Sequence, residues 1–203
     1  MARYTGPKDK LSRREGFDLF GKGGKLTRLN VPPGVHGPRG FTRGFRRRTQ
    51  YGRQLREKQK TKRMYGVLEK QFKGYVERAL KSKGNTGEAL LTLLEKRLDN
   101  VVFRLGFAPT RPSARQLVTH RHVLVDGKKV NIPSYEVKSG ETVNLTAAAM
   151  QIPAVKRLLD EKDTKTPAWL KRRAAVGRVE GSPKREDITE PIIEQDIVEF
   201  YSR

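Results

Sequence analysis

The sequence has no cysteine, and this absence excludes disulfide bridges and thiolate metal sites. Tryptophan occurs once, at Trp169, and aromatic residues make up 7% of the chain. No window approaches the roughly 20 apolar residues that span a bilayer, and the first residues include no apolar stretch typical of a signal peptide. A basic helix on a membrane surface would need large apolar residues on one face, which this sequence does not supply. We therefore expect a cytoplasmic protein without membrane contact.

Acidic residues are also scarce. The 203 residues include 44 Lys and Arg but only 22 Asp and Glu, which gives a net charge of +22. The excess is concentrated in the first 87 residues, with 24 basic and 6 acidic side chains. Like charges at this density oppose compaction unless a polyanion neutralises them. A merely solvated basic surface is the alternative, but the balance favours a nucleic-acid partner.

Residues 1–48 read as an extended basic arm. They contain nine Gly and four Pro, which disfavour helices and strands. The stretch from Arg39 to Arg48 repeats an Arg-Gly-Phe unit, in which guanidinium groups and rings can stack on bases. Because the arm can bury little apolar surface, we expect its polyanionic partner to order it.

Residues 49–88 read as a basic helical region. Thr49 is a candidate cap for one helix, and a second helix carries Leu68, Phe72, Val76 and Leu80 at helical spacing. The first helix is basic nearly all round. Such a helix either bridges solvent or is held by a partner, and its positive charge favours RNA.

Residues 89–179 read as a helix–helix–hairpin module followed by a small sheet. A capping box at Asn85 precedes a continuous apolar stripe from Leu90 to Leu105, which predicts one core helix ending at Gly106. Thr110 caps a shorter helix, and Asp126-Gly127 between short apolar runs predicts a hairpin. Residues 142–146 predict another strand, residues 153–159 one or two helical turns, and residues 166–170 the start of a capped helix.

Residues 180–203 form an acidic tail with seven acidic and three basic side chains. Its last seven residues alternate well enough to predict a strand. Acidic residues with apolar neighbours do not suit an RNA face. The tail either packs internally against the basic half or docks on a basic protein neighbour.

Motifs for catalysis are poorly supported. Residues 16–23 approach a phosphate-binding loop, but Gly23 stands where a magnesium-binding hydroxyl is required and no apolar helix follows. The only His residues are His36, His120 and His122, too few and too scattered for a metal site. There is no nucleophile elbow and no isolated carboxylate pair. We predict an α+β protein that is not an enzyme and holds no cofactor or metal.

Several blocks resemble the bacterial family of ribosomal protein four of the small subunit. They are the opening MARYTGP, YGRQLREKQKTKRMYG from residue 51, RLDNVVFRLGFAPTR from residue 97, ARQLVTHRHVLVDGKKVNIPSYEV from residue 114, and the closing IVEFYSR. The resemblance covers nearly the whole chain. Many relatives carry a four-Cys zinc site in the arm, which this chain lacks, and usually a Gly where Arg121 stands between the two His.

The resemblance implies a helical domain with the basic arm, plus a domain of helices packed on a small antiparallel sheet that contains the RNA-binding module. It implies direct binding of small-subunit ribosomal RNA, nucleation of the body of the subunit, and a contribution to translational accuracy with ribosomal proteins five and twelve. It further implies direct contact with protein five, and a place beside protein three on the path by which messenger RNA enters. The alternative is an RNA-modifying enzyme with the same module, such as a pseudouridine synthase, but no part of this chain reads as its catalytic domain.

The resemblance and the basic runs together name the candidate site residues. In the arm and the basic helical region, the expected RNA-facing residues are Arg3, Arg13, Arg14, Arg43, Arg46, Arg47, Arg48, Tyr51, Arg53, Arg56, Lys58, Lys60 and Arg63. In the module they are Arg111, Arg115, Gln116, His120, Arg121, His122, Lys128, Lys129 and Asn131. The expected protein-interface residues are Glu194, Asp196, Glu199, Phe200 and Tyr201. Most RNA contacts should position the phosphate backbone, while specificity should come from the shape of the RNA.

Overall fold

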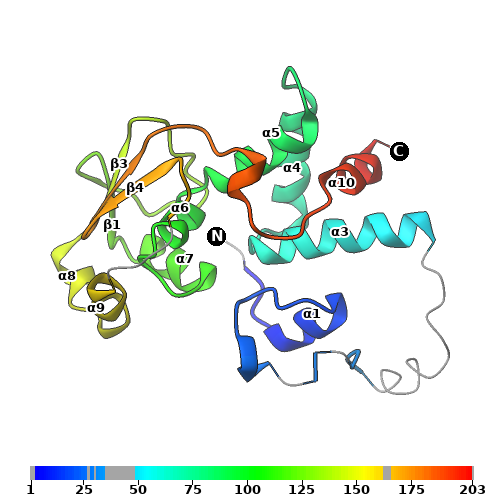
Figure 1. Ribbon diagram of the computed structural model, residues 1–203, viewed down its shortest axis with the longest axis horizontal. Coiled ribbons are helices and arrows are strands. Elements are labelled where there is room, and N and C mark those ends of the chain that lie inside the picture. The colour runs from blue at the N-terminus through cyan, green and yellow to red at the C-terminus, as the bar shows by residue number, and fades with distance from the viewer. Residues whose placement is uncertain (1–2, 27, 30, 35–48, 162–165, 203) are drawn as a thin grey trace. The chain divides into compact units, whose positions relative to one another are not determined.

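A computed structural model describes residues 3–26, 28–29, 31–34, 49–161 and 166–202. The chain divides into two compact units. The first unit comprises Met1–Ser82 together with Pro191–Arg203, and the second comprises Lys83–Glu190. Figure 1 shows the elements of both units, and each unit is described by itself below.

The first unit is helical. It contains α1 (Lys8–Glu15), a 3-10 turn η1 (Gly23–Lys25), α3 (Gln50–Met64), α4 (Glu69–Leu80) and α10 (Glu194–Tyr201). Thr49 caps α3 as predicted, because its hydroxyl accepts a hydrogen bond from the Gly52 N–H at 3.2 Å. Helix α10 packs along α3 (Figure 1). The apolar core includes Phe72, Val76 and Ile197, each essentially inaccessible to solvent.

Part of the arm is more regular than the sequence predicted. The eight residues of α1 form a helix that ends at Gly16, which adopts the left-handed conformation with φ 67°. The ordering comes from within the chain, because Arg13 donates hydrogen bonds to the carbonyl oxygens of Val31 and Pro32 at 2.9 and 3.2 Å. The Arg-Gly-Phe repeat and His36 lie outside the described residues.

The strand predicted at the C-terminus is wrong, because residues 194–201 form helix α10. A short apolar pattern fits either period, and here Ile197 and Tyr201, four residues apart, both face the unit. Glu194 and Asp196 in the first turn favour the helix through its dipole. Arg203, the last residue of the predicted strand, lies outside the described residues.

The helical part of the second unit contains α5 (Thr86–Glu95), α6 (Leu98–Arg104) and α7 (Arg111–Thr119). The single core helix predicted for residues 90–105 is therefore wrong. The break falls at Arg97, whose backbone is extended and forms an isolated bridge with Glu136. The buried Arg97 guanidinium then pairs with Asp99 at 2.6 Å, which satisfies its charge inside the unit. Asn85 and Thr110 cap their helices as predicted. The capping box predicted at Asn85 is replaced by other bonds, because Asn85 accepts from the Gly87 N–H and its side-chain amide donates to Glu88.

The second unit also holds a five-stranded antiparallel sheet in the order β2-β1-β3-β5-β4. The strands are β1 (Val123–Val125), β2 (Lys128–Lys129), β3 (Thr142–Leu145), β4 (Leu170–Arg173) and β5 (Val176–Val179). The predicted hairpin at Asp126-Gly127 is confirmed, with φ angles of 45° and 77° that suit its tight turn. The Asp126 carboxylate also accepts two hydrogen bonds from Thr142, which tie the hairpin to β3.

The described part of the second unit also contains two short helices, α8 (Ala147–Met150) and α9 (Pro153–Asp160), and a 3-10 turn η2 (Arg185–Asp187). The helix predicted to start within residues 166–170 is wrong, because this segment turns directly into β4. Trp169 and Leu170 are buried there in the core that joins α6 and α7 to the sheet. The Leu105 side chain packs closely on the backbone of β5 at Gly177, where a Cβ atom would lie 2.3 Å from it. The α+β fold class is confirmed.

Candidate nucleic-acid interface

The predicted basic residues of α3 are largely engaged within the first unit. Arg56 and Arg63 both pair with the buried carboxylate of Glu15 at the end of α1. Lys58 pairs with Glu69 at 2.8 Å, and Lys60 pairs with Glu57 at 2.8 Å along the helix. Burial lowers the pKa of Arg63 in spite of the opposing charge of Glu15. These cations stabilise the helical unit, so they present less charge to a partner than the sequence suggested.

The N-terminal part of the arm leaves other cations accessible. Arg3 and Arg14 are exposed, whereas Arg13 is half-buried by its two backbone hydrogen bonds. On α3, Tyr51 and Arg53 are exposed at the start of the helix. The predicted residues Arg43, Arg46, Arg47 and Arg48 lie outside the described residues.

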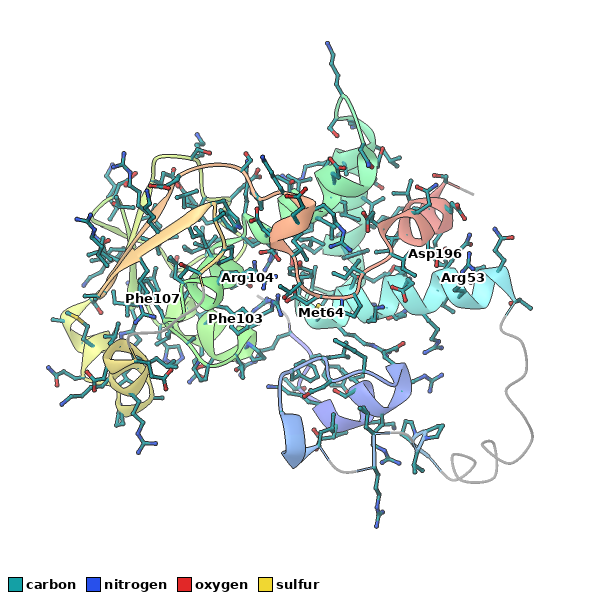
Figure 2. All side chains as sticks on the ribbon, viewed as in Figure 1. Arg53, Met64, Phe103, Arg104, Phe107 and Asp196 are labelled. Atoms are coloured by element: carbon teal, nitrogen blue, oxygen red, sulfur yellow. The ribbon has the colours of Figure 1, made fainter. Side chains whose placement is uncertain are left out.

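Asp196, Glu199 and Phe200 of α10 face α3. Asp196 is 3% exposed, and Arg53 pairs with it at 3.1 Å (Figure 2). Glu199 accepts a hydrogen bond from Gln54 at 2.6 Å, and the Lys58 ammonium lies 4.6 Å from the centre of the Phe200 ring. Of the two alternatives for the tail, the structure shows internal packing against basic residues for these side chains.

Glu69 joins α3, α4 and α10. Its carboxylate accepts hydrogen bonds from Lys58 and Lys62, and from the Tyr201 hydroxyl at 2.7 Å. Although burial opposes ionisation, these three donors lower the pKa of Glu69 to about 2. Burial and the neighbouring Glu69 carboxylate raise the pKa of Tyr201 in turn. The phenol is therefore held as a donor within the unit.

Two predicted RNA-facing arginines of the module are also held by acids. Arg111 pairs with Glu190 at 2.6 Å, and Arg115 is only 8% exposed with Asp99 3.6 Å away. Arg104 (Figure 2) lies between Glu95 and Glu190 at 2.8 and 2.7 Å. Although burial opposes ionisation, Arg111 and Arg104 lower the pKa of Glu190 to about 2. This network of ion pairs holds α6 and α7 together and ties them to Glu190, the last residue of the unit.

The end of α7 and the β1–β2 hairpin present the remaining module residues together. The exposed ones are Gln116, His120, Arg121, Lys128, Lys129 and Asn131, and His122 is half-buried. The rings of His120 and His122 have centroids 6.3 Å apart. Strand β2 is an outer strand of the sheet, so its two lysines lie on an unpaired edge. Among these residues, His120, Arg121, Lys128 and Lys129 form what we call the accessible basic cluster.

Arg121 occupies a backbone conformation that glycine usually takes. Its φ is 61°, its N–H donates to the Val118 carbonyl, and the His122 N–H donates to the Leu117 carbonyl. This hydrogen-bond pair is the Schellman motif, which ends helices with a left-handed residue that is usually Gly. A side chain there costs about 1–2 kcal/mol. The fold tolerates the cost and places a cation between the two His.

The sequence analysis missed a basic surface on β4 and β5. Lys171, Arg173 and Arg178 are exposed, and Lys171 lies opposite Arg178 in the strand register. The alternation of buried Leu170, Gly177 and Val179 with these cations was the available signal. It was obscured because residues 166–170 read as the start of a helix.

Within the described ranges, no group of three His, Cys, Asp or Glu residues could hold a metal ion. No helix in that part of the chain is both long and apolar enough to span a bilayer. The accessible side chains instead carry cations, amide groups and aromatic rings. These groups suit contacts with the phosphates and bases of a nucleic acid.

Comparison with known proteins accounts for this arrangement. Residues 3–95 match the family described as "Ribosomal protein S4/S9 N-terminal domain", and residues 96–143 match the family described as "S4 domain". The second match covers α6, α7 and the hairpin, where the accessible basic cluster lies. The chain is therefore a ribosomal protein, which acts in translation, and it carries an RNA-binding S4 domain.

Relatives of full length identify the family within that class. The small ribosomal subunit protein uS4 of Geotalea daltonii is 50% identical over 213 residues, with all of both chains covered. Those of Dictyoglomus turgidum and Bacteroides thetaiotaomicron are 51% and 49% identical, also over the whole of both chains. The chain belongs to the bacterial family of small ribosomal subunit protein uS4, whose members are structural, non-enzymatic proteins of the cytoplasmic ribosome.

Proposed function

We propose that this protein binds small-subunit ribosomal RNA directly, through the cluster formed by His120, Arg121, Lys128 and Lys129, with the arm as a second contact. The observation that carries the proposal is the exposure of this cluster on the segment that matches the S4 domain. The net charge of +22 supports it, since a phosphate backbone would neutralise the excess. Gln116, Asn131 and His122 lie beside the cluster and would donate or accept hydrogen bonds.

The cations that pair internally have a supporting part in this proposal. Arg111, Arg115, Arg56, Lys58, Lys60 and Arg63 hold helices in position and add long-range positive potential. Arg3, Arg14, Tyr51 and Arg53 supply further accessible contacts, as do Lys171, Arg173 and Arg178 on the sheet. For RNA binding we divide the chain into four segments, namely an arm (1–48), a basic helical region (49–88), the module and sheet (89–179) and the acidic segment (180–203).

The finer proposals concern assembly and accuracy. A direct binder with so high a charge can neutralise a junction of RNA helices early, so we infer that it nucleates the body of the small subunit. We also infer a contribution to translational accuracy with ribosomal proteins five and twelve. Proteins five and three would be its neighbours near the path by which messenger RNA enters. The resemblance of the sequence to its family supports these steps.

The contact with protein five would use exposed residues at the start of α10, namely its N-cap Ile193 and Gln195 in the first turn. Ile193 is 51% exposed and Gln195 is exposed, whereas Asp196 faces inward. Deleting α10 would remove core residues, so point substitutions are the sharper test. Ile193→Lys with Gln195→Lys should alter misreading rates in a reconstituted subunit while RNA affinity stays within twofold. An unchanged misreading rate would contradict this part of the proposal.

Binding of the first large domain of small-subunit ribosomal RNA across a salt titration tests the central proposal. If about ten cations contact phosphate, log affinity should fall against log salt with a slope of roughly −7 to −9. Replacing Lys128 and Lys129 by Gln should make the slope shallower by up to about 2, because two phosphate contacts are lost. Lys156→Gln with Arg157→Gln, on exposed positions of α9, is the matched control. Equal affinity for an unrelated structured RNA would overturn the proposal.

A further inference from the structure

A pocket of about 320 Å³ lies between the N-terminal segment, α1 and α3 in the first unit. Two helix faces supply its cations. Lys10 and Arg14 are four residues apart on α1, and Arg56 and Arg63 are seven apart on α3. These spacings place each pair on one side of its helix. The pocket is therefore a basic concavity inside one unit, apart from the hairpin cluster described above.

The charge of this pocket is only partly neutralised from within. Glu15 has a side chain 1% exposed and pairs with both Arg56 and Arg63. Four cations thus line or approach the space around one carboxylate, and Lys10 and Arg14 are exposed at its rim. The Glu15 pairs hold the two arginines in place. An anionic group entering beside Arg14 and Lys10 would meet a preorganised positive site.

An aromatic ring and aliphatic side chains form the rest of the wall. Tyr4 lines the pocket and is 45% exposed, so its ring is accessible to a ligand. The ring lies against Gly6, where a Cβ atom would come within 2.6 Å of the Tyr4 hydroxyl. Leu11 and Leu55 are half-buried in the same lining. A flat ring over aliphatic groups and beside guanidinium groups suits a base attached to a phosphate.

We propose that this pocket binds a single unstacked nucleotide of the bound RNA, with its phosphate at Lys10 and Arg14 and its base against Tyr4. The inference rests on the proposed RNA-binding function and deepens it. The pocket volume lies at the lower end of small-ligand sites, which fits one nucleotide rather than a helical segment. Duplex RNA hides its bases, so the nucleotide would come from a loop, bulge or junction strand.

The first experiment titrates the full-length protein with nucleoside 5′-monophosphates, ribose 5-phosphate and inorganic phosphate, followed by NMR. Binding of the monophosphates should be at least about fivefold tighter than that of ribose 5-phosphate, because base stacking adds to the phosphate contact. Tyr4→Ala should remove this difference, and Arg14→Gln should weaken all three ligands together. Gly6→Ala should also reduce the difference, because it displaces the Tyr4 ring without changing charge.

Matched controls come from the same unit. Leu80→Ala removes an exposed large side chain at the end of α4, and Gly74→Ala adds a methyl group where nothing lies within 4 Å. Both should leave the selectivity for nucleotides unchanged. Equal binding of nucleotides and ribose 5-phosphate by the unaltered protein would overturn the proposal. Loss of selectivity in the control variants as well would overturn it too, because the effect would then not be local to the pocket.

The second experiment decides the source of the nucleotide. The complex with the ribosomal RNA fragment should no longer bind the monophosphates, and ultraviolet irradiation should cross-link Tyr4 to one RNA position. Unchanged monophosphate binding in the complex would overturn the proposal in favour of a free nucleotide. Failure of specific RNA binding in the salt titration would instead overturn the proposed function, whatever the mononucleotides do.

Discussion

At the residue scale, the same residue type has opposite roles at two places in one short segment. Arg115 is buried beside Asp99 and holds α7 in the unit, whereas Arg121 is exposed six residues later. Arg121 also adopts the left-handed conformation, which its Cβ makes unfavourable. The cost is local, because the hydrogen bonds around this turn are those of an ordinary helix end.

Arg121→Gly should stabilise the free protein by about 1 kcal/mol, because Gly adopts φ 61° without steric cost. The same change should weaken RNA binding by removing a cation next to His120 and His122. Urea unfolding followed at the second unit and the RNA titration would measure the two effects. Arg121→Lys, which keeps both the Cβ and the charge, should leave the stability unchanged. A destabilised glycine variant would contradict the argument.

Glu190 gives a pH-dependent contribution to stability. Its pKa is lowered from 4.5 to about 2, since Arg111 and Arg104 outweigh its burial. A lowered pKa in the folded state means that the contribution is complete above pH 4.5 and is lost as pH falls towards 2. Glu190→Gln should cost roughly 2 kcal/mol at pH 7, and this difference from the unaltered protein should shrink below pH 4.

Urea unfolding from pH 7 down to pH 3 would check the Glu190 prediction. Glu186→Gln, at an exposed position in η2, is the control and should parallel the unaltered protein. A constant difference between Glu190→Gln and the unaltered protein at every pH would show that packing, rather than the charge, carries the effect.

At the scale of elements, α10 buries its core residue, whereas the extended N-cap residue just before the helix stays outside the core. Ile197 is fully buried, and Ile193, four residues earlier, is 51% exposed. Ile197→Ala should cost about 2–4 kcal/mol because it leaves a cavity against α3, whereas Ile193→Ala should cost under about 0.5 kcal/mol. Thermal unfolding of the two variants would measure this. Similar losses at both positions would contradict the packing of α10.

Local signals predicted most elements and failed where tertiary contacts decide. The caps at Thr49, Asn85 and Thr110 and the Asp126-Gly127 turn are local chemistry, and each is confirmed. The break at Arg97 depends on a bridge to Glu136, which no local pattern in residues 90–105 reveals. Likewise, α1 depends on Glu15 meeting α3, and a Gly-rich context hid it.

The candidate site was predictable in residue type but not in accessibility. Basic runs and the family resemblance named the residue types, and their role in RNA binding stays a prediction. They could not show that Arg56, Arg63, Arg111 and Arg115 meet Glu15, Glu190 and Asp99, because these acids are distant in sequence or appear unremarkable. The pocket between α1 and α3 was hidden for the same reason, since its residues come from two separate segments.

At the scale of the whole molecule, net charge opposes folding. With +22, the free protein should gain stability when salt screens its self-repulsion. Raising KCl from 20 to 200 mM shortens the screening length from about 20 to about 7 Å, and the melting temperature should rise by roughly 2–5 °C.

A non-ionic osmolyte at matched osmolality controls for effects other than screening in this salt experiment. A melting temperature that falls with salt would mean that ion pairs such as those of Glu15 outweigh the repulsion among the exposed cations.

The return of α10 to the helices near the start of the chain has a consequence for biosynthesis. The second unit is a continuous stretch that is complete once Glu190 has been made, whereas the first unit needs residues on both sides of it. We expect the second unit to mature first on the translating ribosome, reversing the usual N-to-C order in which domains fold. In chains stalled while α10 is still inside the ribosomal tunnel, protease should cut α3 and leave the second unit intact. Once a longer C-terminal extension brings α10 out of the tunnel, α3 should be protected, except when Ile197 is replaced by Asp.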